Sequence, residues 1–129
     1  MLKGVGAIII NEGKILLLLR KRSPEKGKWG LPGGSVKVGE KIESALKREV
    51  NEELGVEILH QHLIDCFIYE VKAENFICES YIFISYIQGN AINVEKNIHE
   101  QIQWFDLNYM PNNITIPVKR ALLQDKINE

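Results

Sequence analysis

Six of the seventeen acidic residues lie within residues 40–57, and three of these have the spacing of one helical face. Glu49, Glu52 and Glu53 are three and four positions apart, so on a helix their Cβ atoms would lie roughly 5–6 Å from one another. Carboxylates that close repel each other, and a hard divalent cation such as Mg²⁺ or Mn²⁺ would neutralise them. Because Mg²⁺ typically completes its shell with water and substrate phosphates, the cluster indicates phosphate chemistry. The alternative is a solvated helix face paired with basic residues of the same helix.

A helix over residues 41–54 would position these carboxylates. Apolar residues recur at every fourth position along it, which is the stripe of an amphipathic helix, and Gly55 stands where a left-handed C-terminal cap belongs. At about 100° per residue, Glu53 projects beside the buried stripe. We therefore expect this carboxylate to be partly sheltered from water and costly if unpaired. The glycine pair 33–34 predicts a tight turn before the helix.

Strands account for most of the other predicted elements. β-Branched, aromatic and apolar runs predict strands at 4–11, 13–20, 56–71, 76–88 and 101–105. The first two are predicted to pair as a hairpin and the next two as an antiparallel pair, and Pro117 opens a last helix through about residue 126. A chain of 129 residues suffices for one core, so we expect residues 1–129 to form a single domain. The fold class is α/β (α+β), a mixed β-sheet flanked by helices.

The residues around the glutamates follow one pattern, G-x5-E-x7-R-E-U-x-E-E-x-G-U, in which U is aliphatic. Its positions are filled by Gly34, Glu40, Arg48, Glu49, Val50, Glu52, Glu53, Gly55 and Val56. By this pattern the chain resembles the Nudix hydrolases. Its seven fixed identities and two aliphatic positions would coincide by chance with odds on the order of one in ten million. The resemblance implies an α/β/α sandwich and a metal-dependent hydrolase that acts on phosphoric anhydrides.

The resemblance also implies a metal site and catalytic residues. The Gly33 carbonyl, Glu49 and Glu53 match metal ligands, with Mg²⁺ or Mn²⁺ as the cofactor. Glu52 belongs to the catalytic set, where it binds a second ion or helps to deprotonate water. A further catalytic or metal-binding glutamate often follows the pattern in this family, and Glu100 is the candidate here. The alternative for Glu100 is a solvated loop carboxylate.

Other positions are expected to orient groups or bind substrate. Arg48 can fork onto Glu40 or a neighbouring glutamate and thereby fix the geometry of the catalytic carboxylates. Glu40 and Gly55 are structural positions of the pattern, and Gly34 allows the backbone to approach the phosphates closely. Residues 14–28 contain six basic residues and one acid, and Arg20, at a predicted strand end, is the candidate for holding substrate phosphates.

The implied reaction is attack of water on phosphorus in a diphosphate linkage of a nucleotide. The small, minimal form of the chain favours a nucleoside triphosphate, oxidised ones included, cleaved to the monophosphate and pyrophosphate. ADP-ribose or a nucleotide sugar is the alternative substrate, although residues 71–73 lack the proline that ADP-ribose pyrophosphatases often place there. An alternative of another class is a nucleotide-sensing module that binds without cleaving.

Composition limits the other function classes. The formal net charge is −1, which argues against stable binding to nucleic acids or anionic membranes. No apolar run approaches the roughly 20 residues that span a bilayer, and no secretory cleavage pattern follows the N-terminus, so we expect a cytoplasmic protein without a membrane segment. It is expected to be a monomer or a homodimer.

Overall fold

The strand residues form two sheets in a computed structural model of the chain, which describes residues 1–128. One sheet has the order β5-β1-β7-β6 and comprises β1 (Lys3–Ile8), β5 (Gly33–Ser35), β6 (Glu57–Val71) and β7 (Phe76–Gln88). In the other, β3 (Lys14–Arg20) pairs with β2 (Ile10–Asn11), β4 (Trp29–Gly30) and β8 (His99–Asp106). The helical segments of the described residues are α1 (Ile42–Leu54), α2 (Ile116–Leu122) and the 3₁₀ turns η1 (Lys72–Glu74) and η2 (Asp125–Asn128).

The first strand differs from its prediction. Only β2 pairs with β3 in a hairpin, across a turn in which Glu12 and Gly13 both have positive φ, as a two-residue hairpin turn of this kind requires. β1 instead lies parallel to β7, from Lys3 opposite Glu79 to the end of the strand, and antiparallel to β5. The predicted hairpin over residues 4–20 is therefore wrong for β1, because the chain moves from one sheet to the other between β1 and β2. The antiparallel pairing of β6 with β7 is confirmed.

Helix α1 packs against the sheets with the apolar stripe predicted from the sequence. Its fully buried apolar residues are Ala45, Leu46, Val50 and Leu54. They share a core with alternate residues of the strands, among them Val5 and Ala7 of β1 and Leu16 and Leu18 of β3. The alternation follows from the two-residue period of a strand, and the intervening residues face a second core. Gly55 ends the helix with φ of 69°, as the predicted left-handed cap.

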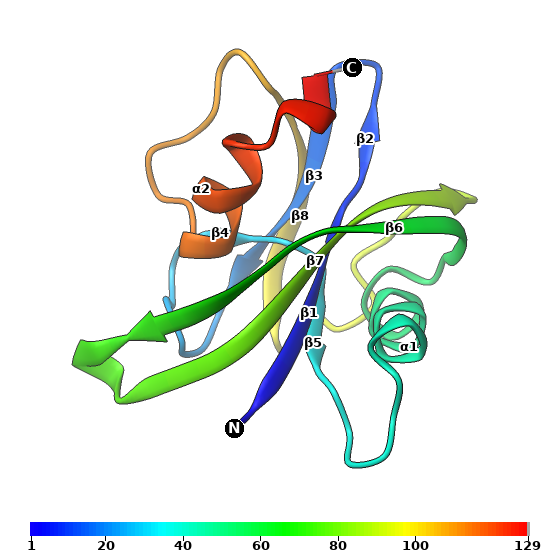
Figure 1. The fold of residues 1–129 in the computed structure, drawn as a ribbon. Helices are drawn as coiled ribbons and strands as arrows, with labels where there is room; N and C mark the ends of the chain where they lie inside the picture. The colour runs from blue at the N-terminus through cyan, green and yellow to red at the C-terminus, as the bar shows by residue number, and fades with distance from the viewer. Residues whose placement is uncertain (129) are drawn as a thin grey trace.

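Helix α2 covers the second core. Val118 and Ala121 pack there with Ile8, Ile15 and Leu17, which alternate with the residues facing α1. The strands thus lie between α1 and α2, on opposite sides of the sheets (Figure 1), and the predicted α/β/α arrangement is confirmed. The last predicted helix is shorter than expected, since α2 ends at Leu122 and η2 follows. None of the helices formed by residues 1–128 has the length and apolar character needed to span a membrane.

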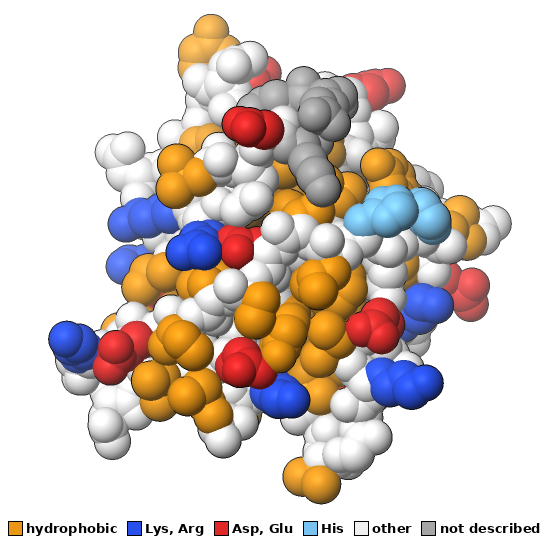
Figure 2. Space-filling view, in the orientation of Figure 1, with side chains coloured by type: hydrophobic (Ala, Val, Ile, Leu, Met, Phe, Trp, Pro, Cys, Tyr) orange, Lys and Arg blue, Asp and Glu red, His pale blue; other side chains and the backbone are white. Residues whose placement is uncertain are grey.

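The face on which β6 and β7 lie in front carries hydrophobic side chains between scattered charges (Figure 2). Exposed large hydrophobic residues of these two strands are Leu59, Leu63, Ile68, Ile77 and Tyr86. Lysine and arginine side chains on this face stand apart, and several lie beside an acidic one. The described residues on this face therefore form no continuous basic stripe of the kind that is typical of a nucleic-acid-binding surface.

Candidate functional site

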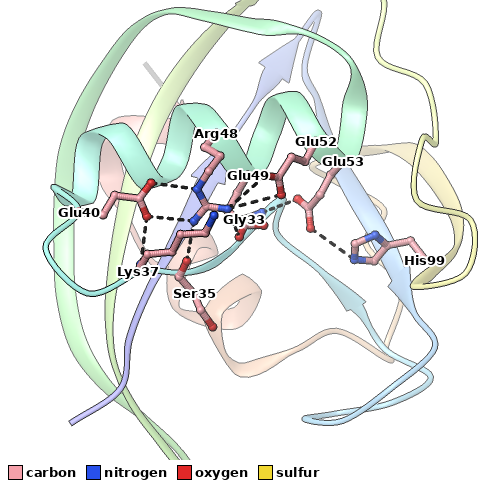
Figure 3. A network of polar contacts seen from close by, with 9 residues as sticks. All are labelled: Gly33, Ser35, Lys37, Glu40, Arg48, Glu49, Glu52, Glu53 and His99. Carbon is pink, nitrogen blue, oxygen red and sulfur yellow. Dashed lines mark hydrogen bonds and ion pairs between the residues drawn. The ribbon is translucent and has the colours of Figure 1, made fainter.

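The carboxylate of Glu53 lies against the glycine turn that precedes α1. The Gly33 backbone N–H donates to Glu53 Oε1 at 2.8 Å, so the turn and the helix are joined at this point (Figure 3). Glu53 is only 4% exposed. The expectation that Glu53 would be sheltered beside the apolar stripe is confirmed. Two predicted metal-site residues, Gly33 and Glu53, are thus in direct contact.

Gly34 allows β5 to approach the second carboxylate of the helix. A Cβ at Gly34 would lie 2.5 Å from Glu49 Cδ, so no larger residue fits unless Glu49 moves. Glu49 and Glu53 lie one turn apart on the side of α1 that faces β5, whereas Glu52 is more open, with 44% of its side chain exposed. The sequence predicted the three carboxylates on one helical face, and the structure brings two of them, Glu49 and Glu53, to the glycine turn.

Arg48 links the carboxylates to the loop before α1. Its Nε and Nη2 donate to the two oxygens of Glu40 at 2.9 and 3.0 Å, which is the predicted fork. Its Nη1 donates to Glu49 at 2.9 Å and lies 3.4 Å from both oxygens of Glu52, and Nη2 also donates to the Ser35 carbonyl at 3.0 Å. One guanidinium therefore fixes the loop, β5 and two carboxylates of α1 relative to one another.

Hydrogen bonding lowers the pKa of Glu40 to about 2. The largest cause is the Arg48 guanidinium, and the next is the Lys37 backbone N–H, which also donates to this carboxylate. A lowered pKa contributes stability above the ordinary value of about 4.5 and loses it as the pH falls toward 2. Arg48→Lys, which keeps the charge but loses the fork, should therefore be less stable than the wild type at pH 6. That difference should shrink as both proteins are titrated toward pH 2 and followed by circular dichroism. A difference that does not change with pH would contradict this account.

Two residues beyond the pattern complete the acidic site. Glu53, Glu95 and His99 each present one ligand atom, and these atoms lie within 4.8 Å of one another. The backbone N–H of His99 donates to the Glu95 carbonyl at 3.0 Å, so the two residues lie on one helix-like turn that ends at the first residue of β8. Burial, with Arg20 and Arg22 nearby, lowers the pKa of His99 to about 4. His99 is therefore neutral at pH 7, and its 3.6 Å approach to Glu53 is not an ion pair.

The sequence analysis predicted Glu100 as the further catalytic or metal-binding glutamate and did not indicate Glu95 or His99, which lie beside Glu53 in the structure. Ile102 and Trp104 face the core beneath α1, and strict alternation along the strand would direct Glu100 to the same side. The pairing of β8 with β3 shifts register between Leu18 and Arg20, however, and it is His99 that is buried while Glu100 is exposed. A register shift of this kind can redirect a side chain next to a site. The four-residue spacing of Glu95 and His99 is the signal that could have indicated the pair.

Carboxylates are concentrated at this site, and two of them are buried or partly buried. Burial raises the pKa of Glu53 well above its ordinary value, and Glu49 and Glu95 raise it further. Burial also raises the pKa of Glu49, against the opposing effect of Arg48. A buried carboxylate without a cation is costly, whereas a divalent cation would balance several at once. The oxygen-rich donor set of three α1 carboxylates and Glu95, with one neutral imidazole, therefore fits a divalent cation.

Two adjoining cavities open at this site. The larger, the acidic cavity, has a volume of about 540 Å³ and is lined by the charged or polar residues Arg20, Arg22, Glu49, Glu52, Glu53, Glu74, Glu95 and His99, among others. The smaller, of about 170 Å³, is lined by residues such as Leu31, Tyr69, Cys78 and Thr115. Arg20, Gly33 and Gly34 line both cavities, whereas Glu100 lines neither. The predicted substrate-binding residues Arg20 and Gly34 thus lie where the two cavities meet.

The architecture and the site agree with one family. Residues 2–125 match the profile of the NUDIX domain. The chain belongs to the Nudix hydrolase family. Its Nudix pattern supplies the glycine turn, the Arg48 fork and the carboxylates of α1, while Glu95 and His99 come from the segment that leads into β8.

Two similar proteins have names that describe different activities. The chain is 35% identical over 107 residues to an ADP-ribose pyrophosphatase of Methanocaldococcus jannaschii, with 83% of this chain and 63% of that protein covered. It is 33% identical over 108 residues to an oxidized purine nucleoside triphosphate hydrolase of Danio rerio, with 81% and 65% covered. The chain therefore spans just under two thirds of the length of these relatives.

Solved structures share the whole fold. The crystal structure of a MutT NUDIX hydrolase from Burkholderia pseudomallei has a TM-score of 0.90 and 36% sequence identity, with 95% of each chain covered. A MutT protein from Methanosarcina mazei has a TM-score of 0.82 and 25% identity, with 99% of this chain and 95% of that chain covered. The two-sheet arrangement with α1 and α2 is therefore the Nudix fold in its MutT-like form.

Proposed function

We propose that this Nudix protein is a divalent-cation-dependent pyrophosphohydrolase that cleaves a nucleoside triphosphate to the monophosphate and pyrophosphate. One observation carries the proposal: Glu53 is buried and forms no ion pair with a described Lys or Arg side chain, at the point where the α1 carboxylates, Glu95 and His99 converge on a cavity. A protein that only displayed these side chains to solvent would have no reason to bury one of them. The arrangement suits a substrate that arrives with its own phosphates and a metal ion.

The cofactor in this proposal is Mg²⁺ or Mn²⁺, held by Glu49, Glu53 and the Gly33 carbonyl. When bound, such an ion polarises phosphoryl oxygens and lowers the pKa of an attacking water. Arg48 fixes the acceptor geometry of Glu49 through its 2.9 Å hydrogen bond. Glu52, which is open to the cavity, takes the proton of the attacking water.

The cationic side of the acidic cavity is suited to the phosphate chain. Arg20 and Arg22 also line this cavity, and a guanidinium matches phosphate oxygens in geometry and charge. In the proposal, Arg20 holds a phosphate between the two cavities, with the nucleoside part directed toward the smaller one. The Danio rerio relative and the MutT-like fold support a triphosphate. The Methanocaldococcus jannaschii relative supports ADP-ribose as a second candidate.

A substrate panel tests this proposal. Nucleoside triphosphates, their oxidised purine analogues, ADP-ribose and nucleotide sugars are incubated with Mg²⁺ or Mn²⁺, and the released phosphate species are identified. We expect triphosphates to yield monophosphate and pyrophosphate at the highest kcat/KM. Cleavage confined to ADP-ribose or nucleotide sugars would favour the second candidate, and tight binding without turnover would favour a nucleotide sensor.

Glu95 and Glu100 give opposite expectations in the same assay. Glu95 lines the acidic cavity beside Glu53, whereas Glu100 is exposed and lies outside it. Glu95→Gln should therefore lower kcat by about ten- to a hundredfold, the range seen when a group that supports a metal site is lost. Glu100→Gln should leave kcat within about twofold, since surface changes away from a site are usually small. A larger loss of kcat in Glu100→Gln than in Glu95→Gln would instead support Glu100 as the functional glutamate.

A further inference from the structure

Glu25 is a buried carboxylate in the loop between β3 and β4. It is 6% exposed, although its neighbours Lys26 and Gly27 are exposed. Its φ of 58° lies in the left-handed region, which residues other than glycine rarely adopt. A buried carboxylate in such a conformation requires compensating contacts. Neither the Nudix pattern nor the acidic cavity includes Glu25.

The compensating contacts of Glu25 reach three other parts of the chain. Tyr69 in β6 donates its hydroxyl to Oε2 at 2.5 Å, and the Ile116 backbone N–H, at the start of α2, donates to the same oxygen at 2.9 Å. Lys28 Nζ lies 3.4 Å from Oε1. The Glu25 backbone N–H in turn donates to Glu74 Oε2 at 2.9 Å. These contacts attach the tip of the loop to β6, α2 and the β6–β7 turn.

The same loop holds the Arg20 guanidinium. Arg20 Nε donates to the Pro24 carbonyl at 2.6 Å, and Nη2 donates to the Ser23 carbonyl at 3.2 Å. Both acceptors directly precede Glu25, so any movement of the loop tip moves them. The base of the loop is fixed separately, by backbone hydrogen bonds between Arg20 and both Gly27 and Lys28. The direction of the guanidinium therefore depends on the tip rather than on the base.

We propose that Glu25 is a positioning residue for Arg20: its buried carboxylate ties the loop tip to β6 and α2, so that the Ser23 and Pro24 carbonyls aim the guanidinium at the junction of the two cavities. Two of the five N–H donors of Arg20 are engaged in this way, which leaves the others for a ligand. A guanidinium that is already oriented loses less conformational entropy when it binds a phosphate. The consequence for substrate binding rests on the proposed function, but the positioning of Arg20 does not.

Proton exchange at Arg20 Nε tests the positioning directly. In the wild type, the Nε–H of Arg20 should give a resolved ¹⁵N–¹H resonance that exchanges slowly, because it donates to a fixed carbonyl. In Glu25→Ala, exchange should be at least about tenfold faster while the backbone spectrum stays folded, as expected of local opening. Should Glu25→Ala fail to fold, Tyr69→Phe removes a single hydrogen bond and should shift exchange in the same direction. Unchanged Nε–H exchange in a folded variant would overturn the proposal, whether or not the protein hydrolyses nucleotides.

Asp65→Asn is the matched control for a merely structural effect. Asp65 accepts from Arg120 Nε at 2.7 Å and from Gln124, so this change also weakens a link between β6 and the α2 region, but away from Arg20. It should lower the melting temperature while leaving exchange at Arg20 Nε unaltered. Faster Nε–H exchange in this control as well would show general loosening and would contradict a specific role for Glu25.

Binding of inorganic pyrophosphate in the presence of Mg²⁺, measured by calorimetry, tests the consequence for the ligand. Glu25→Ala should weaken binding by about tenfold in the wild-type background and by less than about twofold in an Arg20→Ala background, as expected for residues of one hydrogen-bond network. Equal losses in both backgrounds would show that Glu25 does not act through Arg20. If the wild type binds no pyrophosphate, the proposed phosphate-binding role of Arg20 fails, while the exchange measurement still decides the positioning of Arg20.

Discussion

Glu53→Gln is expected to lower kcat by roughly a thousandfold, because loss of a metal-site carboxylate removes several kcal/mol of transition-state stabilisation. Glutamine has nearly the same shape as glutamate, and its Oε1 can still accept from the Gly33 N–H. In the wild type, Gly33 N lies 2.8 Å from Glu53 Oε1. The change therefore removes the charge and leaves the turn in place. Glu43→Gln is the control, since Glu43 is an exposed carboxylate on the same helix. A loss of less than tenfold in Glu53→Gln would remove Glu53 from the metal site.

The same substitution should stabilise the metal-free protein. Because burial raises the pKa of Glu53 in the folded state, the folded protein holds a proton that the unfolded chain releases. Stability therefore falls as the pH rises from the ordinary glutamate value toward the raised one, and it stays low above that. In EDTA at pH 7, Glu53→Gln should melt at a higher temperature than the wild type, and the gap should close below about pH 4, near the unperturbed value. Addition of Mn²⁺ should raise the melting temperature of the wild type alone. A variant that melts lower in EDTA at pH 7 would contradict this explanation.

The parts of the structure that depend on local patterns were predictable from the sequence. Helix α1 followed from its apolar spacing and Gly55, and the burial of Glu53 followed from its angular position beside that stripe. The fork of Arg48 on Glu40 could be predicted because the two residues are close in the sequence, one in the helix and the other in the loop that precedes it. In each case the partners lie within about two helical turns or one loop of each other.

Features that depend on distant pairing could not be predicted in the same way. The parallel pairing of β1 with β7 joins residues more than seventy positions apart, and nothing in the first strand identifies that partner. The site of Glu95 and His99 depends on a register shift between β8 and β3, which a regular two-residue alternation cannot anticipate. Arg20 was expected to face substrate from a strand end, but its orientation is set by carbonyls of its own loop and, through Glu25, by β6 and α2.

Gly33→Ala should chiefly impair folding. A Cβ at Gly33 would lie 1.9 Å from the Val5 carbonyl oxygen, and Gly33 has φ of 147°, which an L-residue rarely adopts. Val5 belongs to β1 and Gly33 to β5, and the two strands are paired at this point. Neither backbone can therefore move away without breaking the β1–β5 pairing. Backbone strain and overpacking together should destabilise the protein by about 3 kcal/mol or more. Urea denaturation measures this loss, and a variant within about 1 kcal/mol of the wild type would contradict the close approach, since changes away from such features usually cost less than that.

Gly34→Ala, one residue later, should chiefly impair catalysis. The three atoms nearest to its added Cβ would be Cδ, Oε1 and Oε2 of Glu49, which are the far end of a flexible side chain rather than backbone. Glu49 can therefore turn away and relieve the clash without a shift of the backbone or the core. The loss of stability should stay below about 1 kcal/mol, as is usual for substitutions that disturb neither. The displaced carboxylate, however, leaves both its proposed metal position and its hydrogen bond with Arg48, so kcat should fall by about a hundredfold. The two adjacent glycines would then have different roles: Gly33 allows the pairing of β5 with β1, and Gly34 leaves room for a catalytic carboxylate. Equal losses of stability in the two variants would contradict that division.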